Sequence, residues 1–181
     1  MNTRMIKRLF EKRLLFGVLL AATLSAQTID EYQLKAVFLF NFAKFVEWPA
    51  PAPGDVHDPF TICVAGDNPF GSSLDEVVRG KTVGSRPISI RFISDPQKAL
   101  QCEILFVSAS EGKRERSLLA ALRGSSILTV GDTDDFTANG GIVQFKVIDA
   151  RVRIAIDVEA AARAHLRISP KLLILADRAR N

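Results

Sequence analysis

The stretch Phe60-Thr61-Ile62-Cys63-Val64-Ala65-Gly66-Asp67 decides the fold class of this chain. Six apolar or β-branched residues are followed at once by a glycine and an aspartate, a pattern typical of a buried strand that ends in a loop. Similar runs recur in alternation with helical segments. The further strands that we expect are Ile88–Ile93, Glu103–Ser108 and Ile127–Val130. The helices that we expect between them are Pro69–Arg79, Pro96–Leu100 and Lys113–Arg123. This alternation predicts an α/β sheet with parallel neighbouring strands.

Near the end of the chain the alternation of strands and helices stops. Residues 141–147 and 151–156 alternate with period two and predict an antiparallel hairpin. Two helices should follow, Val158–His165 and Pro170–Ala176, the second capped by Ser169. The sequence therefore predicts a mixed, mostly parallel sheet of about six strands flanked by helices, with an antiparallel C-terminal hairpin.

The front of the chain has the three parts of a secretory signal peptide. A basic region is followed by 11 residues, Leu14–Leu24, that are apolar apart from Thr23, and then by small residues. This run is too short to span a bilayer, which takes roughly 20 residues. We expect residues 1–26 to be removed, with cleavage after Ser25 as the alternative and an uncleaved anchor as a further one. Residues 27–181 then form a single domain in an exported protein.

The charge of the whole chain is +4, with 24 basic and 20 acidic residues. Residues 1–26 carry five of the basic residues and one of the acidic ones, so the remainder has 19 of each. A neutral domain with one tryptophan and one tyrosine has no evident footprint for a nucleic acid. We therefore expect no nucleic-acid partner.

The two cysteines, Cys63 and Cys102, each lie in or beside a strand-like segment. Disulfides persist in exported proteins, so we expect these cysteines to pair, and the alternative is two buried thiols. A catalytic redox role is not favoured, because the two residues do not form a C-x-x-C motif.

The segment Thr28–Trp48 contains no glycine or proline and predicts a long helix. Apolar residues cover most of its circumference, so the helix must be buried on more than one side. One interpretation is a central core helix. The other is a helix that offers part of its surface to a partner or to a second copy of the chain, with these aromatic residues on that surface: Phe38, Phe42, Phe45 and Trp48.

No known catalytic motif occurs in the chain. Its two histidines, His57 and His165, lie in no recognisable constellation. Ser110-Glu111-Gly112-Lys113 matches S-x-x-K without its companion motifs, and residues 132–135 resemble only the start of a calcium loop. We expect a protein that is not an enzyme and has no cofactor or metal.

Three loops should meet at the carboxyl edge of the sheet, where ligands bind in open α/β folds. They contain these candidate ligand-binding residues: Gly66, Asp67, Asn68, Ser108, Ser110, Gly131 and Asp132. The alternative is that they are the turns and helix caps that any α/β domain needs.

The segment Glu31–Pro49, with its regularly placed lysine, phenylalanine and tryptophan residues, resembles the opening helix of the YfiR-like family. The later landmarks of the resemblance are Ile62–Asp67, Phe70-Gly71, Gly80-Lys81, Cys102–Ser108, Leu128–Asp132, Gly140-Gly141 and Leu166–Leu173. The resemblance covers nearly all of the chain after residue 26.

The resemblance implies a periplasmic, non-enzymatic α/β protein that represses an inner-membrane diguanylate cyclase by contacting its periplasmic region. Such a repressor lowers cyclic di-GMP and biofilm formation, and an outer-membrane lipoprotein relieves the repression. The resemblance also places Cys63 and Cys102 at a family disulfide. A homodimer is expected. Two other functions remain open from the residues, a periplasmic small-molecule sensor and, less favoured, a hydrolase that uses Ser108 or Ser110.

Overall fold

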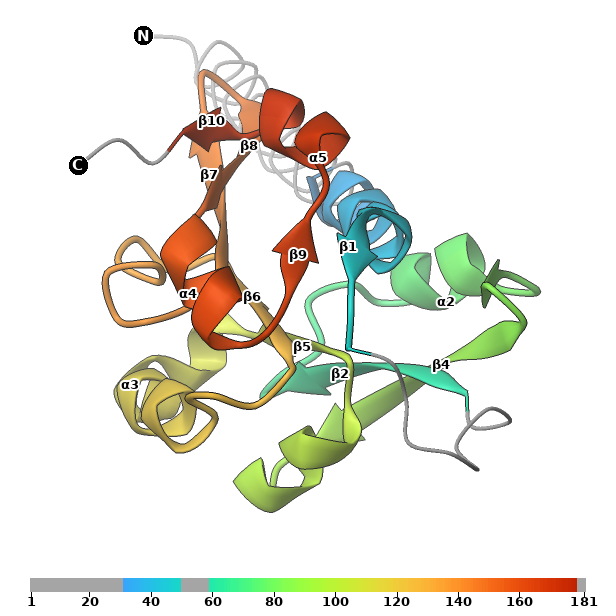
Figure 1. Ribbon diagram of the computed structural model, residues 1–181, viewed down its shortest axis with the longest axis horizontal. Helices are drawn as coiled ribbons and strands as arrows, with labels where there is room; N and C mark the ends of the chain where they lie inside the picture. Colours follow the sequence, from blue (N-terminus) through green and yellow to red (C-terminus); the bar gives the residue numbers. More distant parts are fainter. Residues whose placement is uncertain (1–30, 50–58, 179–181) are drawn as a thin grey trace, which may run out of the picture.

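The computed structural model of the protein describes residues 31–49 and 59–178. Its main element is an eight-stranded sheet (Figure 1). In spatial order the strands are β10 (Asp177–Arg178), β8 (Arg151–Ile156), β7 (Val143–Ile148), β6 (Leu128–Gly131), β5 (Ile104–Val107), β2 (Phe60–Ala65), β4 (Arg86–Ile93) and β3 (Thr82–Val83). The five strands from β4 to β7 are parallel to their neighbours, and β7 and β8 form the antiparallel hairpin. The predicted fold class is therefore confirmed.

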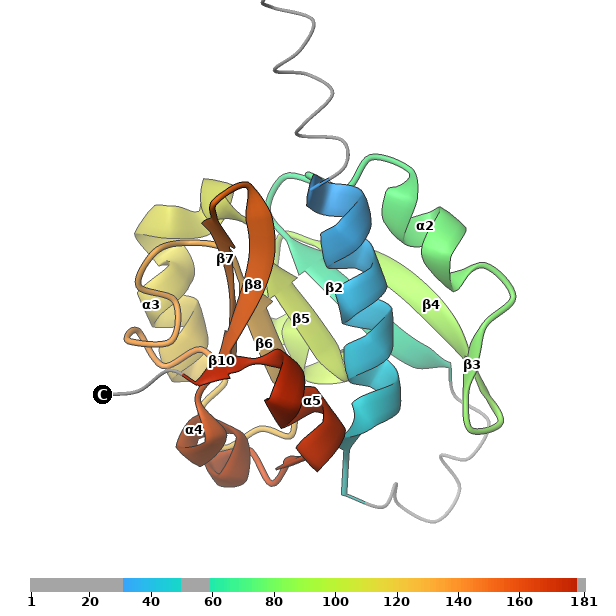
Figure 2. The same cartoon turned by 90° about the horizontal axis from the view of Figure 1, so that it is seen from above.

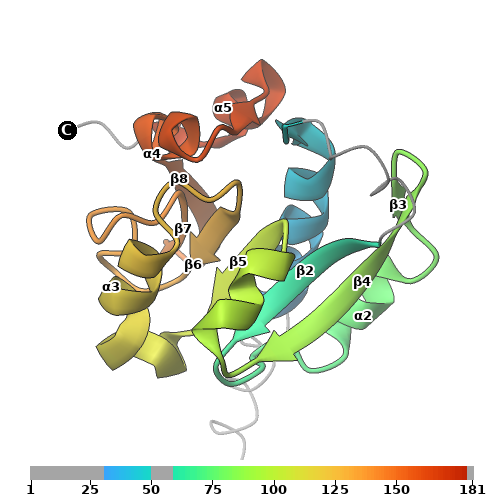
Figure 3. The same ribbon diagram turned by 60° about the horizontal axis from the view of Figure 1, so that its bottom comes forward.

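Helices cover both faces of this sheet. The first described helix, residues 31–45, crosses one face beside α2 (Ser73–Val78), and α5 (Pro170–Leu175) lies near its end (Figure 2). The 3₁₀ helix η2 (Pro96–Gln101) and α3 (Gly112–Ala121) cover the opposite face (Figure 3). We call the helix of residues 31–45 the N-terminal helix.

Each face of the sheet has its own apolar core. The larger core joins the N-terminal helix, α2, α4 (Val158–Arg163) and α5 to inward side chains such as Ile62 and Phe106. The smaller core lies under η2 and α3 and contains both cysteines. All six residues of β2 are buried, because this strand is flanked by strands on both sides and by a core on each face.

The structure corrects several predicted boundaries. The predicted helix Thr28–Trp48 ends earlier: Val46–Glu47 form a short strand, β1, that pairs antiparallel with β9 (Arg167–Ile168) in a separate two-stranded sheet. The predicted helix Pro69–Arg79 begins only at Ser73, because Asn68 closes a turn over the preceding residues. The predicted signal peptide, residues 1–26, lies outside the described residues.

Candidate functional site

The carboxyl ends of four strands lie side by side at one edge of the sheet. The pairing register places Ile93, Ala65, Val107 and Gly131 in one row across β4, β2, β5 and β6. From β2 the chain continues to β4, which lies on one side of β2 in the sheet, and then to β5, which lies on the other side of β2. This edge is therefore a topological switch point, the position where open α/β sheets bind ligands.

Two of the predicted ligand loops meet at this edge. The backbone N–H of Asp67 donates to Oγ of Ser110 at 2.9 Å, and this hydroxyl donates to Oγ of Ser108 at 3.3 Å. Gly66 has φ of +84°, and a Cβ added there would lie 2.4 Å from Oγ of Ser110. Only glycine therefore allows this close approach. Asn68 bonds within its own turn, where its amide donates to the carbonyl of Gly71.

These serines have no evident catalytic base. In the described part of the chain, the hydrogen bonds of their hydroxyls join them to each other and to backbone N–H groups. A serine nucleophile needs an adjacent base such as histidine or lysine. The arrangement at Ser108 and Ser110 fits a loop that closes on itself better than a hydrolase centre.

The third predicted loop takes part in a buried ionic cluster. Nζ of Lys35, whose side chain is 2% exposed, lies 2.8 Å from Oδ2 of Asp132 and 2.6 Å from Oε1 of Glu31. The hydroxyl of Tyr32 donates to the same Asp132 oxygen at 2.8 Å, and Nζ of Lys35 lies 4.2 Å from the Tyr32 ring centroid. We call these four residues the Lys35 cluster. It joins the N-terminal helix to the end of β6.

Two features show how tightly this cluster is enclosed. Oδ1 of Asp132 is buried and has no hydrogen-bond partner among the described residues. Burial raises the pKa of Tyr32 above its usual range, and the negative charge of Asp132 adds to the shift. Tyr32 therefore stays a neutral donor at physiological pH.

Sequence reasoning found Asp132 and missed the rest of this cluster. Lys35 lies among apolar residues of the predicted helix, and a lysine side chain is usually solvated. The available signal was a lysine amid apolar neighbours, but its buried partner lies 97 positions away in the chain. Only the folded chain brings the two together.

Of the four aromatic residues predicted for a partner or dimer surface of the N-terminal helix, Phe42 instead fits the alternative prediction of a core helix. Phe42 is 0% exposed and packs against both Phe38 and Phe145, so it is a core residue. Phe38 and Phe45 are half-buried against the same core. Trp48 is half-buried too, and its Nε1 donates to the carbonyl of Glu103.

The exposed apolar residues of this helix are others. Leu34 and Val37 are 42% and 38% exposed. They are the large apolar residues that this helix exposes most to solvent, and the prediction did not include them.

The predicted disulfide is present. Cys63 of β2 is bonded to Cys102, which precedes β5, with 5.9 Å between their Cα atoms. Both residues are buried in the smaller core. The bond closes a loop of 39 residues and links β2 to the segment that leads into β5. It lies on the face of the sheet that η2 and α3 cover.

A small cavity lies behind the switch point, between η2 and α3. It has a volume of about 120 Å³ and is mostly apolar, with Ile93 and Leu118 in its wall. Glu111, almost fully buried, reaches its rim and pairs with Arg114 at 2.6 Å. A cavity of this size is comparable to one that binds benzene.

Within residues 31–49 and 59–178, no three His, Cys, Asp or Glu side chains are grouped so that they could hold a metal ion. No described helix is long and apolar enough to cross a membrane.

The described residues thus define a class, an α/β fold with an internal disulfide and with switch-point loops that are hydrogen-bonded to each other. The sequence family described as YfiR/HmsC-like matches residues 32–177, and the chain belongs to this family. The family is regulatory and non-catalytic, and its members are periplasmic.

Among solved structures, the chain resembles an ABC domain in complex with L-Trp from Streptococcus pneumonia. The two are 9% identical with a TM-score of 0.48, and the match covers 66% of this chain. The chain spans about half the length, 54%, of that protein. A likeness of this degree carries no functional argument.

Proposed function

We propose that this protein is a periplasmic repressor that holds an inner-membrane diguanylate cyclase inactive by binding the periplasmic region of the cyclase. The observation that carries the proposal is the family match, which covers residues 32–177 of the chain. The Cys63–Cys102 disulfide supports it, since such bonds persist in an oxidising compartment.

A repressor of this kind works by binding one state of its partner better than the other. A ligand shifts a conformational equilibrium only by its difference in affinity for the two states. The repressor must therefore bind the inactive cyclase more tightly than the active one. Release by an outer-membrane lipoprotein would follow if both partners compete for one surface of the repressor.

The exposed apolar strip of the N-terminal helix, Leu34 and Val37, is the surface that we assign to a partner or to a second copy in a homodimer. The test is a pull-down from solubilised membranes with the tagged, exported protein. A matched variant, Leu100→Asp, changes a residue of η2 that is 55% exposed on the opposite face.

We expect the wild type and Leu100→Asp to retain an inner-membrane protein with a cyclase domain, and Leu34→Asp to lose it. Cellular cyclic di-GMP should rise with Leu34→Asp alone. If the folded wild-type protein retains no cyclase, the repressor function is wrong. If both variants behave like the wild type, the surface is wrong and the function stands.

Export by a cleaved signal peptide belongs to the same proposal. N-terminal sequencing of the protein recovered from the periplasm should begin at Gln27, or at Ala26 for the alternative cleavage site. An intact Met1 on the recovered protein would contradict export by cleavage.

The cavity beside Glu111 favours a second candidate function, a small-molecule sensor. Its volume of about 120 Å³ fits a ligand of about the size of benzene. A ligand that binds only the folded protein raises its melting temperature. A screen of small aromatic and aliphatic amines tests this, and the absence of any concentration-dependent shift would leave the repressor function alone.

A further inference from the structure

The outer halves of β7 and β8 project from the sheet as a two-stranded arm, residues 146–153. β7 pairs with β6 only through Val143 and Gln144, and β8 pairs with β10 only through Ala155 and Ile156. Beyond these positions, and among the residues that the structure describes, the two strands pair only with each other. Three residues per strand make the arm about 10 Å long. We call it the β7–β8 arm.

The tip of the arm is a tight turn. Asp149 and Ala150 have φ of 50° and 57°, the left-handed conformation at both central positions of a two-residue hairpin turn. Such a turn matches the twist of the strands and holds them together. The arm is therefore a defined projection of the sheet.

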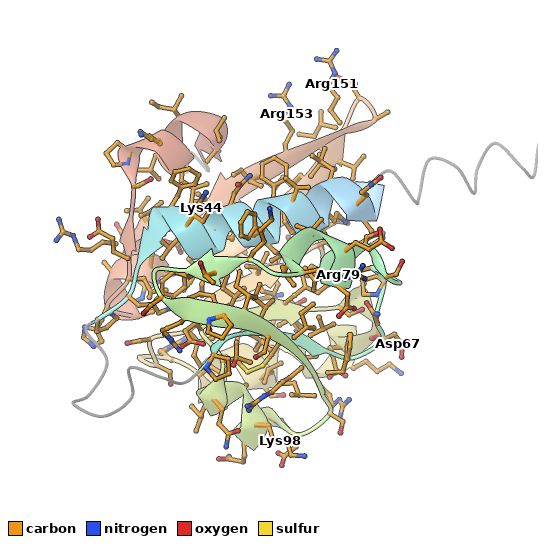
Figure 4. All side chains as sticks on the ribbon, turned by 90° about the vertical axis from the view of Figure 1, so that its right-hand side faces the viewer. Lys44, Asp67, Arg79, Lys98, Arg151 and Arg153 are labelled. Atoms are coloured by element: carbon orange, nitrogen blue, oxygen red, sulfur yellow. A yellow bond between two sulfur atoms is a disulfide. The ribbon has the colours of Figure 1, made fainter. Side chains whose placement is uncertain are left out.

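One face of the arm is basic. Residues that lie directly opposite on paired antiparallel strands share a face, and the register pairs Lys146 with Arg153 and Ile148 with Arg151. The three basic residues are exposed. Figure 4 shows Arg151 and Arg153 side by side at the end of the arm, on the side of the molecule away from Lys98.

This arrangement opposes the stability of the hairpin. Like charges directly opposite each other destabilise a strand pair, so the repulsion between Lys146 and Arg153 does not favour the hairpin. From residue 27 onward the chain carries equal numbers of basic and acidic residues. The cations are therefore concentrated locally and are not part of a generally basic surface.

The apolar residues of the arm indicate the shape of its partner. Val147 and Ile148 are 52% and 47% exposed, and because they are consecutive in a strand they point to opposite faces. A protein that packs on one face would leave the other residue in water. A lipid interface that receives the tip end-on covers both.

We propose that the β7–β8 arm docks on an anionic phospholipid bilayer. Lys146, Arg151 and Arg153 contact lipid phosphates, and Val147 and Ile148 enter the interface. Asp149 at the apex limits the depth to the headgroup layer, because a carboxylate is costly in hydrocarbon. The proposal rests on the arm alone and goes beyond the proposed repressor function, since the bilayer is a second binding partner that would fix the orientation of the domain.

The test is sedimentation of the purified, exported protein with vesicles of phosphatidylcholine alone or of phosphatidylcholine mixed with phosphatidylglycerol. A basic side chain near an anionic surface strengthens binding about fivefold. The triple variant Lys146→Gln, Arg151→Gln, Arg153→Gln should therefore bind the anionic vesicles about 100-fold more weakly. Added salt should weaken wild-type binding.

The matched control removes the same three charges elsewhere, from the exposed residues Lys44, Arg79 and Lys98. These residues lie away from the arm in Figure 4. The control should bind anionic vesicles within about threefold of the wild type. A second variant, Val147→Ser with Ile148→Ser, keeps every charge and should still weaken binding to the vesicles. This variant tests the proposal if the triple variant fails to fold.

Three outcomes would overturn the proposal. The first is equal loss in the triple variant and its control, which would show a net-charge effect. The second is wild-type binding that is absent or equal on the two vesicle types. The third is failure to bind vesicles together with capture on immobilised poly-glutamate, which would assign the arm to an acidic protein. Because the test contains only lipid, its result is independent of whether a cyclase is the partner.

Discussion

Replacing Lys35 by methionine should destabilise the protein by about 3 kcal/mol. The change keeps the unbranched apolar stem of the side chain and removes the charge that lies 2.8 Å from Oδ2 of Asp132. The side chain of Asp132 is only 7% exposed, and in the variant its Oδ2 keeps the hydroxyl of Tyr32 as its hydrogen-bond donor in the Lys35 cluster. Its Oδ1 has no hydrogen-bond partner among the described residues even in the wild type. Breaking a buried ion pair by removing one partner costs about 3–5 kcal/mol. We choose the lower end because Glu31, 26% exposed, stays solvated without Lys35.

Urea unfolding followed by tryptophan fluorescence measures this loss. Trp48 is the only tryptophan, and it packs edge-on against Phe60 at a centroid distance of 5.1 Å, so its emission reports on the core. At about 1–3 kcal/mol per molar of urea, the midpoint should fall by roughly 1–3 M.

The double variant Lys35→Met with Asp132→Asn is the matched control. It removes both charges, so no uncompensated buried charge remains, and it should recover more than half of the loss. The reasoning would be refuted if Lys35→Met changed the free energy of unfolding by less than about 0.5 kcal/mol, a usual value for a surface substitution.

Three further predictions concern the disulfide, the N-terminal helix and Tyr32. Removing the disulfide by changing Cys63 and Cys102 to alanine should lower stability by about 4 kcal/mol, since the bond closes a loop of 39 residues, and a calorimetric melt would measure it. Phe42→Asp should unfold the domain, whereas Leu34→Asp should leave a native circular dichroism spectrum, because Phe42 is 0% exposed and Leu34 is 42% exposed. A folded Phe42→Asp protein would show that the buried face of the helix has been misassigned. Tyr32 is the only tyrosine, so phenolate absorbance reports on it alone, and its titration should occur above the usual pKa of about 10. An acid whose pKa is raised by folding contributes stability that is present below its unfolded pKa and is lost as pH rises above it, so stability should decline above about pH 10 and decline less in Tyr32→Phe.

The sequence predicted the order and type of most strands because their signals are local. Apolar β-branched runs bounded by glycine and aspartate gave β2 with its observed bounds, Phe60–Ala65. Alternation gave the C-terminal hairpin. The Ser169 cap of α5 was also predicted, and its side chain accepts a hydrogen bond from the N–H of Leu172 as expected.

The short strands β1, β9 and β10 could not be predicted in the same way. Two-residue strands carry no periodicity, and their pairing depends on partners more than 100 positions away for β1 and β9. The predicted helix was therefore extended through Val46 and Glu47, although tertiary pairing ends it before them.

At the site, the sequence by itself determined which loops follow the strand ends, which cysteines can pair and which family the chain resembles. The tertiary structure alone decided what those residues contact. It turned Ser110 toward the backbone of Asp67, buried Lys35 against Asp132, and placed Phe42 in the core while leaving Leu34 in water. The physical reason is that burial and ion pairing depend on segments that meet only after folding. Strand patterns, helix caps and cysteine positions depend on residues that are close together in the sequence.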